Sequence, residues 1–199
     1  MWRKFFEQHW SECSLREPVD VSALEKCQDE LSVLIPKPLV DMFRETNGVL
    51  GPDGEYLILP VEEVVDTNVD MWLNHEYEGL YMPFESLFFI SFDQSDDMYA
   101  FPILGDKTDA QRIFKWRRES DGRILYAFGL EQYLYKRWKC FLEADPYFWE
   151  RDINCKDFDD YRMFLRWLSH PSDSRKECEV GADVQFAPED EAPGSSMIG

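Results

Sequence analysis

The feature that most constrains the fold is a change in hydrophobic spacing partway along the chain. Up to Val65, apolar residues recur every three or four positions, which is the spacing of helical faces. Between Leu87 and Phe128 the pattern changes to short apolar runs rich in aromatic and β-branched residues, separated by polar segments. Helices followed by a block of strands predict an α+β fold with a mainly antiparallel or mixed central sheet and helices packed against it.

The strand-like runs predict two β-hairpins. Short polar residues and glycine between two apolar runs are typical of tight turns that join antiparallel strands. Each hairpin pairs two runs across a turn: Leu87–Phe92 with Met98–Phe101 across 93–97, and Arg112–Trp116 with Ile124–Phe128 across 120–122. One more short strand is expected over Tyr56–Leu59, after the turn-forming sequence Gly51-Pro52-Asp53-Gly54.

Helices are predicted on both sides of this strand block. The apolar spacing places them over Trp2–Cys13, from Ser22 to before Pro36, from Pro36 to Asn47-Gly48, from Pro60 onward, over Leu130–Leu142 and over Phe158–Leu168. Residues 1–170 are therefore expected to form one domain with an N-terminal helix and a C-terminal helical extension. Residues 171–199 hold seven acidic and two basic residues without a periodic apolar face, so we expect an acidic flexible tail.

The charge balance restricts the classes of partner. Forty acidic and 21 basic residues give a net charge of −19 and a pI near 4.4. Nucleic acids and anionic membranes are bound through clustered Lys and Arg, so neither is an expected partner. A basic protein surface is favoured, although the same charge could simply maintain solubility. The sequence does not define the oligomeric state.

The cysteines predict a reducing compartment. Cys13, Cys27, Cys140, Cys155 and Cys178 are odd in number and form no CxxC pair. Charged residues interrupt the N-terminal apolar stretch, which therefore does not resemble a signal peptide, and no apolar run approaches the length of a membrane span. We expect a cytoplasmic protein.

The sequence contains none of the common catalytic or cofactor signatures. His9, His75 and His170 lie in unrelated segments without zinc-ligand spacing. The nucleophile-elbow, P-loop, dinucleotide-binding and HExxH motifs are also missing. We therefore expect no enzymatic activity, no catalytic residues, no bound metal and no cofactor.

Two kinds of charged segment have alternative interpretations. The oxygens of Asp93, Asp96 and Asp97 could cap their turn, contact a partner or bind a divalent cation. Because the segment lacks the spacing of a 12-residue calcium loop, the first two are favoured. Basic residues lie beside aromatic ones in 115–118 and 136–139, as in surfaces that bind single strands. In so acidic a chain, we expect Trp116 and Trp138 to face the core and the bases to be solvated or paired with acids.

The order of motifs resembles the SUKH superfamily. The similarity begins at Ile35-Pro36-Lys37-Pro38-Leu39, followed by Phe43 and Asn47-Gly48, and continues through Tyr56–Val64. The strands at 89–92, 96–101 and 112–116 and the helix start Phe128–Leu134 extend it, so that it covers about residues 20–142. The resemblance implies a SUKH-like α+β fold. It also implies a protein-binding role, because many bacterial members are immunity proteins that neutralise toxins and other members are cell-wall regulators or interaction proteins.

This resemblance and the acidic charge together suggest an immunity protein that binds a basic, nucleic-acid-targeting toxin domain. The alternative is a regulatory or scaffold protein that acts on host proteins. Loops displayed by a rigid sheet usually carry recognition, and an aromatic residue among acids can anchor a basic partner. We therefore expect the partner-binding residues to be Glu76, Tyr77, Glu78, Asp93, Asp96 and Asp97.

Overall fold

The apolar runs of the second half form one antiparallel sheet. The computed structural model describes residues 1–143 and 157–158. The sheet follows the order β4-β5-β7-β8-β9, with β6 paired to β5 outside this path. Its strands are β4 (Leu87–Phe92), β5 (Met98–Leu104), β6 (Lys107–Thr108), β7 (Ile113–Trp116), β8 (Arg123–Ala127) and β9 (Asp157–Phe158). All pairings between these strands are antiparallel, so the predicted α+β fold and both predicted hairpins are confirmed.

A smaller sheet joins the N-terminal half to this larger one. It has the order β1-β2-β3, formed by Ser14–Leu15, Val49–Leu50 and Tyr56–Ile58. Only β3 was predicted, because two-residue strands leave no alternating pattern in a sequence. The Leu59 backbone N–H donates to Ile90 O at 2.9 Å, and Ser91 Oγ donates to Tyr56 O at 2.6 Å. These bonds hold β3 beside β4.

The helices lie close to their predicted positions. They are α1 (Trp2–His9), α2 (Val21–Leu31), α3 (Lys37–Phe43), α4 (Val61–Leu73) and α5 (Gly129–Glu143), with the 3-10 turn η1 at His75–Tyr77. The helix from Pro36 ends at Phe43, before the predicted Asn47-Gly48 stop. Asn47 instead caps α4, because its Oδ1 accepts from Val61 N at 2.8 Å. No helix in the described part of the chain is long and apolar enough to cross a membrane.

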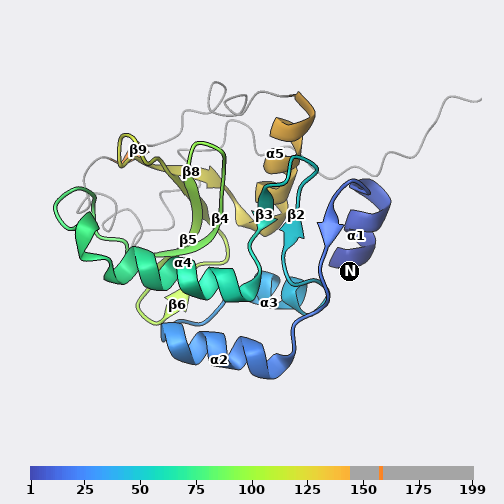
Figure 1. Cartoon of the computed structure of the whole chain (residues 1–199), viewed down its shortest axis with the longest axis horizontal. Helices are drawn as coiled ribbons and strands as arrows, with labels where there is room; N and C mark the ends of the chain where they lie inside the picture. The colour runs from blue at the N-terminus through green and yellow to red at the C-terminus, as the bar shows by residue number, and fades with distance from the viewer. Residues whose placement is uncertain (144–156, 159–199) are drawn as a thin grey trace, which may run out of the picture.

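Alternate residues of the central strands face two apolar clusters. In β4, Phe88 and Ile90 join a large cluster with α1, α2, α3 and α5, whereas Leu87 and Phe89 join a second cluster with Phe84 and Trp116. Figure 1 shows α4 running along the β4 side of the sheet, next to α2. The sheet is therefore buried on both faces in this region, which makes it a rigid support for the turns at its ends.

Three predictions extend beyond the described residues. Phe158 belongs to the strand β9, where it pairs with Arg123, so the predicted last helix does not begin there. The rest of that helix, the domain boundary at residue 170 and the acidic tail lie outside the part of the chain that the structure describes. They stay predictions.

Candidate protein-binding surface

The Asp93–Asp97 turn is organised by its own first carboxylate. Asp93 Oδ1 accepts the backbone N–H of Ser95 at 3.0 Å and that of Asp97 at 3.3 Å. The backbone of the turn closes through Asp93 N–H to Asp97 O and Asp96 N–H to Asp93 O, both at 2.9 Å. Asp96 adopts a φ of +58°, a conformation that Asp tolerates better than most residues. The structural role of this turn explains part of its acidic composition.

Two of the three acids point inward, onto buried cations. Lys115 Nζ lies 3.1 Å from Asp97 Oδ2 and 3.3 Å from Asp93 Oδ2, with the lysine side chain only 2% exposed and each carboxylate 11% exposed. The Arg118 backbone N–H donates to Asp97 Oδ1 at 2.9 Å. Burial of a charge is tolerated when it is paired in this way. The structure thus places Asp93 and Asp97 beneath the surface and leaves Asp96, at 64%, as the exposed acid of the turn.

The same buried network extends to helix α5. Arg137 donates to the Tyr99 hydroxyl at 3.1 Å and to Glu55 Oε2 at 3.3 Å, and Tyr99 donates to Asp93 Oδ2 at 3.0 Å. Burial raises the pKa of Glu55, and the Arg137 charge offsets that rise only in part. Burial likewise raises the pKa of Tyr133 to about 12. These groups join β3, β5 and α5 under the turn.

The basic tracts pair with acids as expected at Lys115, Arg118 and Arg137, although Lys115 and Arg137 are buried. Trp116 and Trp138 face the core, as predicted. Lys136 is buried too, and its Nζ donates to Tyr126 O at 2.7 Å. Lys115, Lys136 and Arg137 therefore supply buried counterions and hydrogen-bond donors for the fold.

The other predicted segment, Glu76 to Glu78, forms part of η1 and the residue after it. Asn74 Oδ1 accepts the Glu76 N–H at 3.0 Å, which caps this turn. Glu76 and Glu78 are exposed, and Glu78 Oε1 lies 2.6 Å from His75 Nδ1. Tyr77 is half-buried and packs edge-on against Tyr81, with ring centroids 5.8 Å apart.

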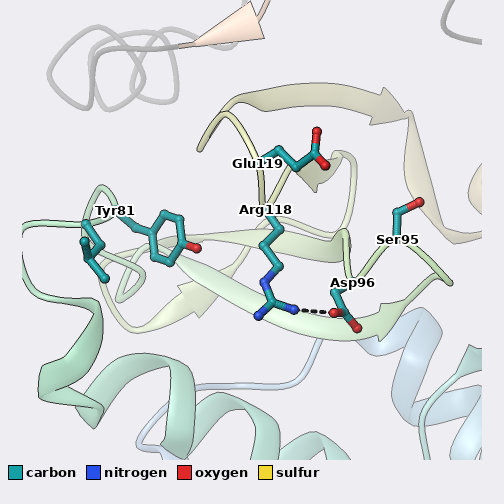
Figure 2. A pocket seen from close by; sticks show the side chains of 6 residues that line it. Tyr81, Ser95, Asp96, Arg118 and Glu119 are labelled. Atoms are coloured by element: carbon teal, nitrogen blue, oxygen red, sulfur yellow. Dashed lines mark hydrogen bonds and ion pairs between the residues drawn. The ribbon is translucent and has the colours of Figure 1, made fainter.

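A surface depression is lined by residues of the acidic turn, of the loop that follows Glu78 and of the β7–β8 turn. It has a volume of about 510 Å³, and we call it the turn depression; it is lined by Leu80, Tyr81, Ser95, Asp96, Arg118 and Glu119. Figure 2 shows Tyr81 on one side, Ser95 and Asp96 on the other, and Arg118 between them with its guanidinium directed toward Asp96. Of the two predicted segments, only the Asp93–Asp97 turn contributes lining residues; the segment 76–78 adjoins the depression through the contact of Tyr77 with Tyr81.

The walls of the turn depression are anchored to the sheet. The Met82 N–H donates to Asp121 Oδ2 at 2.5 Å, and Trp116 Nε1 donates to Asp121 Oδ1 at 2.7 Å. Arg123 donates to the carbonyls of Met82 and Pro83, each at 2.8 Å. The 80–83 loop is thus fixed to the β7–β8 turn, and the concave shape is built into the fold.

Sequence reasoning missed the residues that complete this surface. Tyr81 lies in a segment without helical or strand periodicity, and Arg118 and Glu119 lie in the turn between β7 and β8. The predicted hairpins contain the signal that could have identified Arg118 and Glu119, because the turns of adjacent hairpins lie at the same end of a sheet. The partner-binding role of the six predicted residues stays a prediction.

The described residues contain no group of metal ligands, and two of their cysteines are poorly suited to act as nucleophiles. Within residues 1–143 and 157–158, no three His, Cys, Asp or Glu side chains are grouped so that they could hold a metal ion. Burial raises the pKa of Cys13 and of Cys27 to about 12, which opposes formation of a nucleophilic thiolate. The turn depression presents exposed charged side chains beside Tyr81, which suits recognition.

Comparison with known proteins agrees with this architecture. No curated protein matches the chain significantly. A family model described as SUKH_6, SMI1-KNR4 cell-wall, matches residues 22–134, which is more than half of the 199 residues. The match spans the helices α2 to α4, both hairpins and the start of α5, including every residue that lines the turn depression. The chain therefore belongs to the SUKH superfamily, within the SMI1-KNR4 family.

Proposed function

We propose that this chain is a non-catalytic protein-binding domain and that it serves as an immunity protein, which binds and neutralises a basic toxin domain in the cytoplasm. The observation that carries the proposal is the turn depression, a concave surface of about 510 Å³ whose lining includes two exposed acids, Asp96 and Glu119. Membership of a superfamily that includes immunity proteins supports it.

The electrostatics of the chain favour a basic partner. A net charge of −19 attracts positively charged proteins over distances of about a Debye length, ~8 Å at physiological salt, and speeds their encounter. Asp96 and Glu119 supply exposed carboxylates in the lining of the turn depression, and Glu76 and Glu78 supply exposed carboxylates beside Tyr77, which contacts Tyr81. Tyr77 and Tyr81 supply aromatic contact area that loses little entropy on binding.

A regulatory or scaffold protein that acts on host proteins is the second candidate, and the cell-wall wording of the family description favours it. Gene neighbourhood separates the two. A neighbouring gene for a large secreted protein with a variable C-terminal toxin domain supports immunity. An isolated position among housekeeping genes supports regulation.

The decisive experiment is co-expression with the toxin domain from such a neighbouring gene. We expect the full chain to restore growth and to form a complex with the toxin that survives gel filtration. If growth is not restored and no complex forms, the immunity proposal is wrong. Persistent toxicity despite complex formation would instead favour a scaffold function.

The contact surface is tested by replacing exposed acids with their neutral amide counterparts. Asp96→Asn with Glu119→Gln should slow association at low salt and weaken its salt dependence, as measured by stopped flow. The matched control is Asp29→Asn with Glu25→Gln on α2, which changes the net charge equally at exposed positions elsewhere. Asp93 and Asp97 are left intact because their loss would disturb the buried Lys115. Equal rates for the two double variants would place the contact elsewhere.

A further inference from the structure

Arg118 occupies the turn depression in a way that packing does not require. Its side chain is 55% exposed and contacts only Asp96 among the ion pairs of the described residues, and Asp96 is itself 64% exposed. Exposed pairs of this kind contribute little to folding, because both charges are already well solvated. Figure 2 shows the guanidinium lying between Tyr81 and Asp96, with Glu119 nearby on the same turn.

We infer that Arg118 is an internal competitor, which holds Asp96 in the unbound protein and is displaced by an arginine side chain of the protein partner. This inference rests on the proposed function and identifies the chemistry that the site recognises. The turn depression already accommodates one guanidinium beside a carboxylate and a tyrosine ring, so a second guanidinium supplied from outside finds the same partners.

The surroundings favour a cation over an anion as the incoming group. The lining contains two carboxylates, Asp96 and Glu119, against one guanidinium. Arginine suits this lining better than lysine, because its planar guanidinium can pair with a carboxylate through two N–H groups and stack on an aromatic ring. An acidic partner group would instead meet a chain of net charge −19.

Exchange is mechanically simple because only a side chain has to move. The Arg118 backbone N–H is fixed to the buried Asp97 Oδ1 at 2.9 Å, so the main chain of the turn stays in place. An incoming arginine that pairs with Asp96 through two N–H groups occupies both of its carboxylate oxygens and leaves neither for Arg118. Arg118 must therefore swing toward solvent when the partner's arginine arrives, and this internal competition lowers the affinity of the partner.

The test compares the Arg118→Ala variant with a variant that loses the same charge elsewhere on the surface. Arg118→Ala and Lys37→Ala each change the formal net charge from −19 to −20, and Lys37 also forms an exposed ion pair, with Asp41 on α3. The probe is a fluorescent, end-blocked tetra-arginine peptide, with tetra-lysine as a comparison, and its binding to the full-length variants is measured by anisotropy at low salt. Arg118→Gln repeats the test with a longer neutral side chain, and thermal unfolding verifies that each variant is folded.

We expect Arg118→Ala to bind tetra-arginine about two- to fivefold more tightly than Lys37→Ala does, the size of one exposed ion pair. Asp96→Asn should weaken binding, and in the Asp96→Asn background Arg118→Ala should give no more gain than Lys37→Ala does. Equal affinities for the Arg118 and Lys37 variants, weaker binding by Arg118→Ala, or no peptide binding would each overturn the inference. Peptide binding and the restoration of growth are measured independently. A negative peptide experiment therefore does not contradict the immunity proposal, and a failure to restore growth does not contradict a positive peptide experiment.

Discussion

The ammonium of Lys115 lies 3.1 Å from Asp97 Oδ2, and both side chains are almost completely removed from solvent. Lys115 is on β7, whereas Asp97 precedes β5, so this contact fixes the acidic turn to the neighbouring strand. The exposed Asp96 is thereby held at a defined place on the surface. The sequence does not distinguish the three aspartates of this turn. In the structure, Asp93 and Asp97 are buried counterions and Asp96 is exposed.

Lys115→Met should destabilise the protein by about 3–5 kcal/mol, because it leaves the buried Asp97 without its cation and Asp93 with Arg137 alone, at 3.8 Å. Lys37→Met removes an exposed ion pair with Asp41 and should cost no more than about 1 kcal/mol. Urea unfolding followed by tryptophan fluorescence measures both changes. Similar losses for the two variants would mean that the buried lysine does not hold the turn.

Alanine substitutions at two glycines can separate the destabilisation caused by a positive φ from that caused by steric crowding. Gly48 (φ +88°) and Gly54 (φ +86°) have nearly the same conformation, but a Cβ on Gly48 would lie 2.9 Å from Pro60 N, whereas one on Gly54 would meet nothing within 4 Å. Gly54→Ala should cost about 1–2 kcal/mol from the left-handed conformation alone. Gly48→Ala should cost clearly more, because β2 and the start of α4 must move apart. Equal melting temperatures would contradict this.

The sequence predicted the long elements well, because their periodicity reflects burial on one face. Leu87–Phe92 was located to the residue, and the helix Val61–Leu73 was placed at its start by Pro60. The strands Ser14–Leu15 and Val49–Leu50 were missed, because their pairing depends on residues distant in the chain. Local sequence carries no information on such contacts.

The candidate surface could be predicted only in part for the same reason. Its two acidic segments were identified from composition and from their position beside strands. Which carboxylates face inward depends on Lys115 and Arg137, which arrive from other elements. The sequence alone therefore could not separate Asp96 from Asp93.

Cys13 and Cys27 should react slowly with iodoacetamide in the native protein. Burial is the main cause that raises the pKa of each thiol to about 12, and nearby acids, Glu12 and Glu30 respectively, add to it. At pH 8 the thiolate fraction is then about 10⁻⁴, compared with roughly a quarter for an unperturbed thiol. Mass spectrometry of labelled peptides from native and urea-unfolded protein measures the difference. Fast native labelling at both sites would contradict the prediction.

Asn68→Ala should destabilise the protein by about 2–4 kcal/mol, because Asn68 completes the hydrogen bonds of strand β4 from helix α4. Its Nδ2 donates to Phe89 O at 2.9 Å, its Oδ1 accepts the Phe89 N–H at 2.8 Å, and the residue is completely buried. Removal leaves both backbone groups of Phe89 without these partners, at about 1–3 kcal/mol for each group.

Asp66→Ala is the control, because Asp66 is exposed on the same helix and has a helix propensity similar to that of Asn. We expect urea unfolding to show a change within about 0.5 kcal/mol for the control. Hydrogen exchange of the Phe89 amide should accelerate only in Asn68→Ala, and an unchanged exchange rate would show that the amide of Asn68 does not protect this edge of the sheet.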